Sequence, residues 1–276
     1  MKNTHGINIS ATSGQIKSLN AIGIKCPPGK KMLGAVHTFV AFDISEDDPI
    51  WPHLQILLRR WKEDDGIVTT EFSIEEIEEA KFLEIGAWLH GYPQPNENEF
   101  GYFEETYKNS NRCEKCGIGL KQTAPFQMKG EPKWGRNGIM QLNWVFGELF
   151  VKNDVWKAVF EPHGIGCRPV MNRKGIELQT VVQLVVDESV GIHTEGLESE
   201  HCDECGLIKY SPVQFGMFPS LKSAPANAMV KTIEYFGSGA EAFNALIISQ
   251  EIAKALDAFK VKGATLTPVK DTPTAE

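Results

Sequence analysis

The chain has 276 residues, of which 42% are hydrophobic and 23% are charged, enough to bury a sizeable core in one large domain or two ordinary ones. It carries 28 Lys and Arg against 36 Asp and Glu, a formal net charge of −8. This balance argues against a protein that coats nucleic acid through its phosphates, and six cysteines are too few for a disulfide-built mini-protein.

The sequence shows no targeting or membrane segment. Residues 1–10 lack the apolar stretch of a secretory signal, and no run approaches the roughly 18 to 20 apolar residues that cross a bilayer. We therefore expect a cytoplasmic protein that does not enter the membrane.

The first hundred residues predict a β-α-β-α region. Residues 35–44 are rich in β-branched and aromatic side chains and predict a strand, and Pro49 then opens a helix whose apolar residues in 51–61 recur at helical spacing. Residues 67–72 predict a second strand. A capping box at Ser73 predicts a second helix that runs to about Ile85. No catalytic signature is visible in this region.

A polar, turn-rich segment follows at residues 89–112, and its aromatic residues allow two interpretations. It is either a long connector packed by those aromatics or a partner-binding surface, because loops with tyrosine anchors often bind. We place a boundary here, between an N-terminal α/β region at 1–108 and a C-terminal region at 109–269, with a flexible tail at 270–276. The candidate partner-binding residues are Tyr92, Tyr102, Phe103 and Tyr107.

Two CxxCG motifs, at residues 113–117 and 202–206, carry the clearest chemical signal. Two residues between cysteines let a tight turn aim both sulfur atoms at one ion, and the following glycine allows positive φ. Two such knuckles supply the four ligands of a tetrahedral zinc site. The sequence thus predicts one structural Zn²⁺ held by Cys113, Cys116, Cys202 and Cys205.

The spacing of these motifs is unusual, because 85 residues separate Cys116 from Cys202, whereas simple ribbons place their pairs about 15 to 20 residues apart. A redox role for either CxxC remains an alternative, although Gly117-Ile118-Gly119 is a poor opening for a thioredoxin-like helix. Cys26 and Cys167 have no patterned partner and are expected to be ordinary free thiols.

An internal repeat accounts for the long spacing. Residues 150–159 align with residues 247–256, and a glycine and a Pro-Val pair follow in both copies. Each copy comes after one CxxCG motif, so the order is knuckle, loop, strand, helix and strand. We predict an α+β fold with a duplicated knuckle-strand-helix-strand unit at 109–171 and 198–269, joined by the zinc site.

This pattern resembles the double-CXXCG motif proteins of bacteria, some of which are immunity proteins of toxin systems. The resemblance covers roughly Cys113 to Val269 and depends on both CxxCG motifs and on the C-terminal run 249–263. It implies metal ligation by the four cysteines and carries no catalytic residue.

Signals of an enzyme are weak. Residues 23–30 resemble a phosphate-binding loop, but five residues lie between the glycines instead of four, and Lys31 stands where Ser or Thr would bind magnesium. Residues 236–240 fit neither a nucleophile elbow nor a dinucleotide fingerprint. No histidine pair has metal-ligand spacing, so we expect no catalytic site.

The leading hypothesis is a zinc-stabilised protein-interaction module, an immunity protein that binds and blocks a cognate toxin. The acidic balance suits a basic partner, since complementary charge steers association. The alternative is a zinc-ribbon nucleic-acid-binding protein, because Lys121, Lys129, Lys133 and Arg136 surround Trp134 in the first loop. An enzyme with an unfamiliar site is a third possibility.

Overall fold

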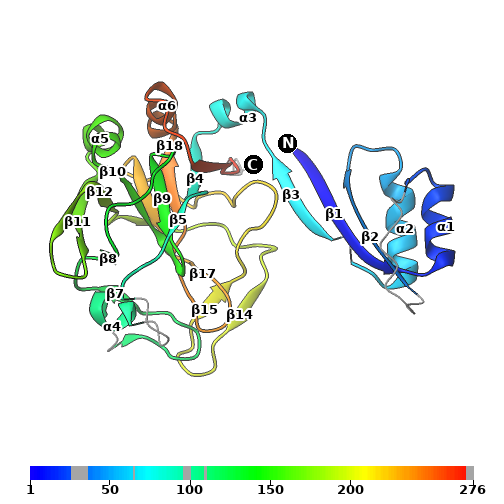
Figure 1. Ribbon diagram of the computed structural model, residues 1–276, viewed down its shortest axis with the longest axis horizontal. Helices are drawn as coiled ribbons and strands as arrows, with labels where there is room; N and C mark the ends of the chain where they lie inside the picture. Colours follow the sequence, from blue (N-terminus) through cyan, green and yellow to red (C-terminus); the bar gives the residue numbers. More distant parts are fainter. Residues whose placement is uncertain (26–36, 65, 96–100, 109–110, 272–276) are drawn as a thin grey trace. The chain divides into compact units, whose positions relative to one another are not determined.

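The computed structural model describes residues 1–25, 37–64, 66–95, 101–108 and 111–271 (Figure 1). The fold is mixed α+β and rich in strands, with 21% of residues helical and 37% in strands. It divides into two compact units. Unit 1 comprises residues 1–73 with the short segment 213–216, and unit 2 comprises residues 74–212 and 217–276. Among the described residues, no helix is long and apolar enough to span a membrane.

Unit 1 is a three-stranded antiparallel sheet with two helices. Strand β1 (Lys2–Ala11) lies between β2 (Thr38–Ser45) and β3 (Ile67–Glu71). Helix α1 (Ser13–Ala21) starts at a capping box formed by Thr12 and Gln15, and α2 (Trp51–Trp61) follows β2. The sequence predicts β2, α2 and β3 at nearly these positions, whereas β1 and α1 were not anticipated.

The apolar faces of these elements form the core of unit 1. Ile7 and Ile9 of β1 are buried against Leu54 and Leu58 of α2 and Leu19 of α1. The spacing of the buried residues of α2 puts them on one side of the helix, which is the pattern expected of an amphipathic helix on a sheet.

The first elements of unit 2 differ from the helix predicted at residues 73–85. The helix α3 (Ile74–Glu79) ends six residues early, and residues Phe82–Ala87 form strand β4. Side chains alternate along β4, with Leu83, Ile85 and Ala87 buried. Strand pairing on both edges of β4 supplies the backbone hydrogen bonds that a continued helix would have made, so tertiary contacts override the local helical pattern.

Two sheets make up most of unit 2, and five strands of the first occur in an order that corresponds to the five of the second: β5, β9, β10, β12 and β11 match β13, β16, β18, β4 and β19. The first sheet has the order β5-β9-β10-β12-β11-β8, and the second has the order β13-β16-β18-β4-β19. The first sheet consists of β5 (His90–Gly91), β9 (Ile139–Leu142), β10 (Val145–Lys152), β12 (Glu177–Val185), β11 (Gly166–Asn172) and β8 (Gln127–Met128). The second consists of β13 (Ser189–Val190), β16 (Met229–Thr232), β18 (Leu246–Ser249), β4 and β19 (Ala264–Pro268).

The second sheet contains one strand from a distant part of the chain, whereas all strands of the first sheet lie within residues 90–185. Strand β12 follows β11 in the chain and pairs with both β10 and β11. Strand β4, which precedes the first CxxCG motif, pairs with β18 and β19, which follow the second. The second sheet is thus completed by a strand from the part of the chain that leads into the first sheet.

The residue register is the same in the two sheets. Val151 of β10 lies between Ile139 and Val182 of its neighbours. Ile248 of β18 lies between Met229 and Leu83 in the same way. Strands β5 and β13 both add in parallel to the outer edge, on β9 and β16.

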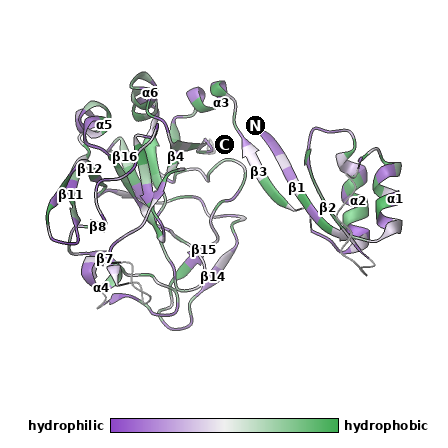
Figure 2. Cartoon of the chain, in the orientation of Figure 1, coloured by the Kyte–Doolittle hydropathy of each residue, from purple (hydrophilic) through white to green (hydrophobic). Residues whose placement is uncertain are grey.

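Short helices follow the two central strands. After β10 come α5 (Asn153–Val155), the π-helical turn η2 (Trp156–Phe160) and the 3-10 turn η3 (Glu161–His163). After β18 comes α6 (Gln250–Ala258), which carries hydrophobic and hydrophilic residues on different sides (Figure 2).

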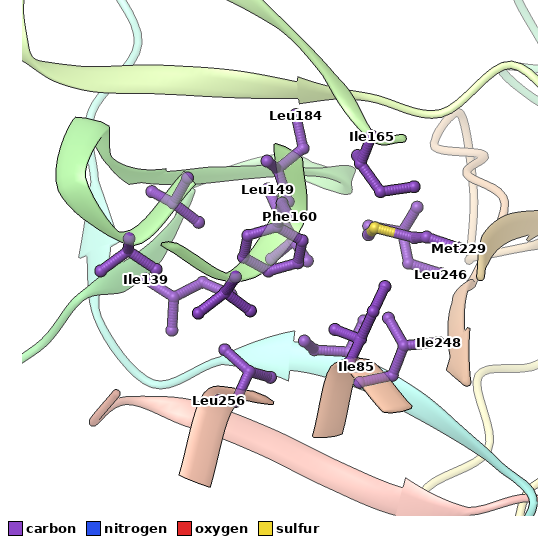
Figure 3. Close-up of a cluster of buried hydrophobic side chains, with 14 of the residues drawn as sticks. Ile85, Ile139, Leu149, Phe160, Ile165, Leu184, Met229, Leu246, Ile248 and Leu256 are labelled. Atoms are coloured by element: carbon purple, nitrogen blue, oxygen red, sulfur yellow. The ribbon is translucent and has the colours of Figure 1, made fainter. Parts of the chain in front are cut away.

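The two helical segments share one core. Leu149 and Phe160 from the first part lie close to Ile248 and Leu256 from the second, and Ile85 of β4 belongs to the same cluster (Figure 3). All five side chains are buried. The hydrophobic effect therefore holds the two sheets and their helices together as one body.

The connections that carry the CxxCG motifs contain the smaller elements of unit 2. Helix α4 (Tyr102–Thr106) leads into β6 (Tyr107–Lys108), which pairs with β7 (Lys121–Gln122) across the first motif. Strand β14 (Ser199–His201) pairs with β15 (Ile208–Tyr210) across the second motif, and β17 (Tyr235–Phe236) joins β15. Each motif thus lies between two antiparallel strands.

The position of β4 predicts how truncated chains behave. A chain that begins at Ile74 is expected to keep a cooperative unfolding transition, because unit 2 stays whole. A chain that begins at residue 109 loses β4, exposes the facing edges of β18 and β19, and is expected to be insoluble or non-cooperative. Circular dichroism during urea unfolding measures the difference, and equal transitions for the two chains would contradict the role given to β4.

Candidate metal centre

The two CxxCG motifs fold into matching turns. In the first, the Cys113 amide donates to the Ile118 carbonyl at 2.8 Å and the Gly117 amide donates to the Cys113 carbonyl at 2.8 Å. The same two bonds occur in the second motif, from Cys202 to Leu207 and from Gly206 to Cys202, both at 2.9 Å.

The glycine that ends each motif is required by the turn. Gly117 has a φ of 79° and Gly206 a φ of 73°, values that other residues adopt at a cost. A Cβ on Gly117 would also lie 2.3 Å from the carbonyl oxygen of Ala240. The first turn is therefore packed directly against the backbone of a second segment, residues 236–242.

The turns bring the four cysteine sulfur atoms together. All four Sγ atoms lie within 4.8 Å of one another. The distance between motifs is 3.7 Å for Cys113 and Cys202, and 3.5 Å for Cys116 and Cys205. A tetrahedral ion with metal–sulfur bonds of about 2.3 Å needs sulfur atoms about 3.8 Å apart. The four cysteines can therefore hold one metal ion, in the arrangement that the sequence predicts.

The four cysteines form no disulfides in this structure. The distances between the motifs are well above the roughly 2.05 Å of a sulfur–sulfur bond, and the cysteines of both motifs are free thiols. A redox pair within one motif is therefore not formed in this structure.

The protein environment moves the pKa values of the Cys202 and Cys116 thiols in opposite directions. Backbone hydrogen bonds, first from Cys205 and then from Glu204, lower the pKa of Cys202 to about 7. Burial raises the pKa of Cys116 to about 12. Four adjacent thiolates repel one another, so full ionisation needs a cation among them, and protons compete with that cation for the sulfur atoms.

A buried lysine joins the two motifs on their inner side. Lys209 of β15 is 2% exposed, and its Nζ donates to the carbonyl oxygens of Cys116, Gly239 and Glu241. Three acceptors satisfy the three N–H bonds of the ammonium group, which is the condition for burying it. A strand of the second motif is thereby fixed to the backbone of the first.

An ion pair joins the motifs on the outer side. Lys115, between the first two cysteines, pairs with Asp203, between the second two. Both side chains are exposed, and the pair raises the pKa of Lys115 and lowers that of Asp203. Exposed pairs of this kind add little stability, but this one orients the two loops toward each other.

The sequence missed Lys209 and residues 236–242 as parts of this centre. A single lysine four residues after the last cysteine has no distinguishing pattern. The segment 236–242 contains Gly237, with a φ of 136°, but its glycines only indicate a turn. Their contacts with the first motif span at least 93 residues of sequence and follow only from the fold.

The four aromatic residues proposed for partner binding occupy different environments. Tyr102 is 1% exposed and belongs to a core cluster, and Phe103 and Tyr107 are half-buried against the same cluster. Tyr92 is 59% exposed and lies 5.9 Å from the ring of Trp144. Most of this segment is thus packed by its aromatics, and partner binding stays a prediction, with Tyr92 the most exposed of the four.

The remaining candidates from the sequence lie away from the centre or beyond the described residues. Cys167 is half-buried in β11, and burial raises its pKa. Trp134, proposed to stack on nucleic-acid bases, is 8% exposed, and the Lys152 ammonium lies 5.8 Å from the centre of its ring. Cys26 lies outside the described residues, as does most of the segment 23–30.

Comparisons with known proteins place the chain in no family. No protein-family model matches the sequence, and a search of curated proteins finds no match.

Cysteine substitution tests the centre. Cys202→Ser is expected to abolish stoichiometric metal binding, because three thiolates and a hydroxyl no longer form the closed site. Elemental analysis of the purified full chain measures the metal content. Cys167→Ser is the matched control, since Cys167 is not among the clustered sulfur atoms, and it should keep its metal. Equal metal content in the two variants would refute the assignment of Cys202.

Proposed function

We propose that Cys113, Cys116, Cys202 and Cys205 hold one Zn²⁺ in a closed structural site. The observation that carries this proposal is the set of sulfur distances between the motifs, 3.5 and 3.7 Å, which suits tetrahedral coordination. Four soft thiolate ligands favour zinc or an iron–sulfur cluster over hard cations. Four cysteines at these distances leave no position for a reacting water molecule, so zinc here would stabilise the fold.

Elemental analysis and chelation distinguish zinc from the other thiophilic metals. We expect about one zinc per chain, and removal by a strong chelator should lower the unfolding temperature of unit 2, because structural zinc binding contributes to folding. Readdition of Zn²⁺ should restore it. Iron with labile sulfide in the purified chain, or an unfolding temperature unchanged by chelation, would contradict the proposal.

We propose further that unit 2 arose by duplication of one strand-knuckle-strand-helix-strand unit. The common strand order and the matching registers of Val151 and Ile248 support it. The pairings of β12 and β4 extend each repeat upstream of its knuckle, to about residues 82–172 and 177–269. The two copies would then share one zinc and exchange one strand.

For the whole chain we propose a protein-interaction module, an immunity protein that binds and neutralises a cognate toxin. Support comes from the resemblance of both CxxCG motifs to the double-CXXCG proteins and from the net charge of −8, which suits a basic protein partner. The buried position of Trp134 favours a protein over a nucleic acid as partner, because its ring is not open for a base to stack on.

Co-expression with the product of the neighbouring gene tests this function. The full chain is expected to protect cells from the toxicity of that product and to copurify with it, and added salt should weaken the complex if charge steers it. The Cys202→Ser variant should protect less, because the binding surface loses its support. The absence of both protection and a complex would count against the immunity function, and a salt-sensitive complex with DNA or RNA would favour the alternative.

A further inference from the structure

A cavity of about 390 Å³ lies in unit 2, beside the first CxxCG turn. One wall is formed by residues 144–148, Trp144 and the start of β10, and the opposite wall is the segment 235–244 that precedes β18. The rings of Phe146 and Phe243 meet at 5.5 Å where these walls approach. The volume is within the range of about 300 to 1,000 Å³ that is typical of ligand sites.

The lining of this cavity is rich in aromatic rings. Three segments of the chain supply them. The seven residues are Tyr102, Phe103 and Tyr107 from the first segment, Trp144 and Phe146 from the second, and Tyr235 and Phe243 from the third. Aromatic faces attract organic cations through their electron-rich π systems, most strongly where water is excluded.

Two of the charged groups at the cavity are already paired with each other. Lys231 Nζ lies 2.7 Å from Glu148 Oε1, and the second carboxylate oxygen of Glu148 accepts a hydrogen bond from Gln183 at 3.0 Å. Lys231 and Glu148 thus neutralise each other and leave little net charge for a ligand.

Glu241 is different, because its carboxylate has no hydrogen bond or ion pair within the described part of the chain, although the side chain lines the cavity. Its backbone is held firmly: the amide donates to Ser238 at 3.1 Å, and the carbonyl accepts from Lys209 at 3.0 Å. Burial raises the pKa of Glu241, and the nearby charge of Lys209, which lowers it, offsets this only in part. A cation placed beside it would replace the solvation lost on burial.

Arg112 supplies a complementary donor at the edge of the cavity. Its guanidinium stacks on Phe103 at 5.2 Å, and Nη2 donates to the Ala240 carbonyl at 3.1 Å. The Nε atom is buried without a partner among the described residues. It can donate to a carbonyl oxygen, which every peptide segment carries beside its side chain.

We propose that this cavity receives the side chain of a lysine or arginine from a protein partner. Its cationic group would lie between the aromatic rings and the Glu241 carboxylate, and a backbone carbonyl of the same segment would accept from Arg112 Nε. This inference rests on the proposed function, since the cation belongs to the basic partner proposed above, and it names the site that such a partner would use.

Short neutral-capped amino acids test the cavity without the partner. In NMR titrations of the full zinc-loaded chain, N-acetyl-arginine amide and N-acetyl-lysine amide should bind and shift resonances of the cavity residues. Glu241→Gln should weaken this binding about tenfold, and Phe243→Leu should weaken it by a smaller factor. Glu161→Gln, an exposed acid in η3 outside the cavity, is the control and should bind as the wild type does.

Each other outcome overturns the proposal. Equal binding of N-acetyl-norleucine amide would show an apolar pocket without charge recognition, and preferred binding of N-acetyl-glutamate amide would show an anion site at Arg112. Absence of binding by all the probes would exclude the site. The folding control is separate: the Glu241→Gln variant should have the same metal content as the wild type.

The partner complex separates this inference from the proposed function. If the probes bind but no toxin partner is found, the immunity function fails and the cation site holds. If a toxin complex forms and Glu241→Gln leaves its affinity unchanged, the function holds and the cation site fails.

Discussion

Four sulfur atoms within 4.8 Å of one another are the constraint on which the junction of the two CxxCG turns depends. Two unit charges 4 Å apart repel by about 1 kcal/mol in water and by several times that near a protein surface, so four thiolates cannot share this space without a cation. Protonated thiols would avoid the repulsion but make only weak hydrogen bonds. A divalent metal, as proposed for this site, would resolve the conflict by joining turns that are 89 residues apart in sequence.

The pairing of β4 explains why these distant turns meet. Strand β4 precedes the first motif but lies between β18 and β19, which follow the second, so the two parts of the chain cannot separate without breaking this interlock of backbone pairing on both edges of β4. The shared core of Phe160 and Ile248 adds an apolar contact to this interlock. The entropy of closing a long loop is thus offset by strand pairing and packing, and a metal bound to the four cysteines would act on turns that are already close. Lys209 completes the junction with hydrogen bonds that need no metal.

Local chemistry could be predicted from the sequence, and long-range pairing could not. The CxxCG motifs identified the four clustered cysteines because a turn with a left-handed glycine is encoded within five residues. Helix α2 and strands β2 and β3 were also visible in local periodicity. Strand β4 was missed because the acidic run before it continues a helical pattern, and only β18 and β19, more than 150 residues away, make Phe82–Ala87 a strand. Lys209 was missed for the same reason, since its three acceptors lie on segments that the fold alone brings together.

The metal site and the proposed cation site are built on the same backbone segments, which lie far apart in the sequence. The proposed cation site has walls from the start of β10, the segment before β18 and the first knuckle, and Gly117 and Arg112 fix that knuckle to Ala240. Glu241 is held by Lys209, which also holds the Cys116 carbonyl. Loss of the metal would loosen the first knuckle and with it one wall of the cavity, while leaving the sheets paired. The zinc proposed for this site would touch no partner, yet it would affect how well a partner binds, because the preorganisation of Glu241 and Arg112 would depend on the backbone that the proposed ion holds.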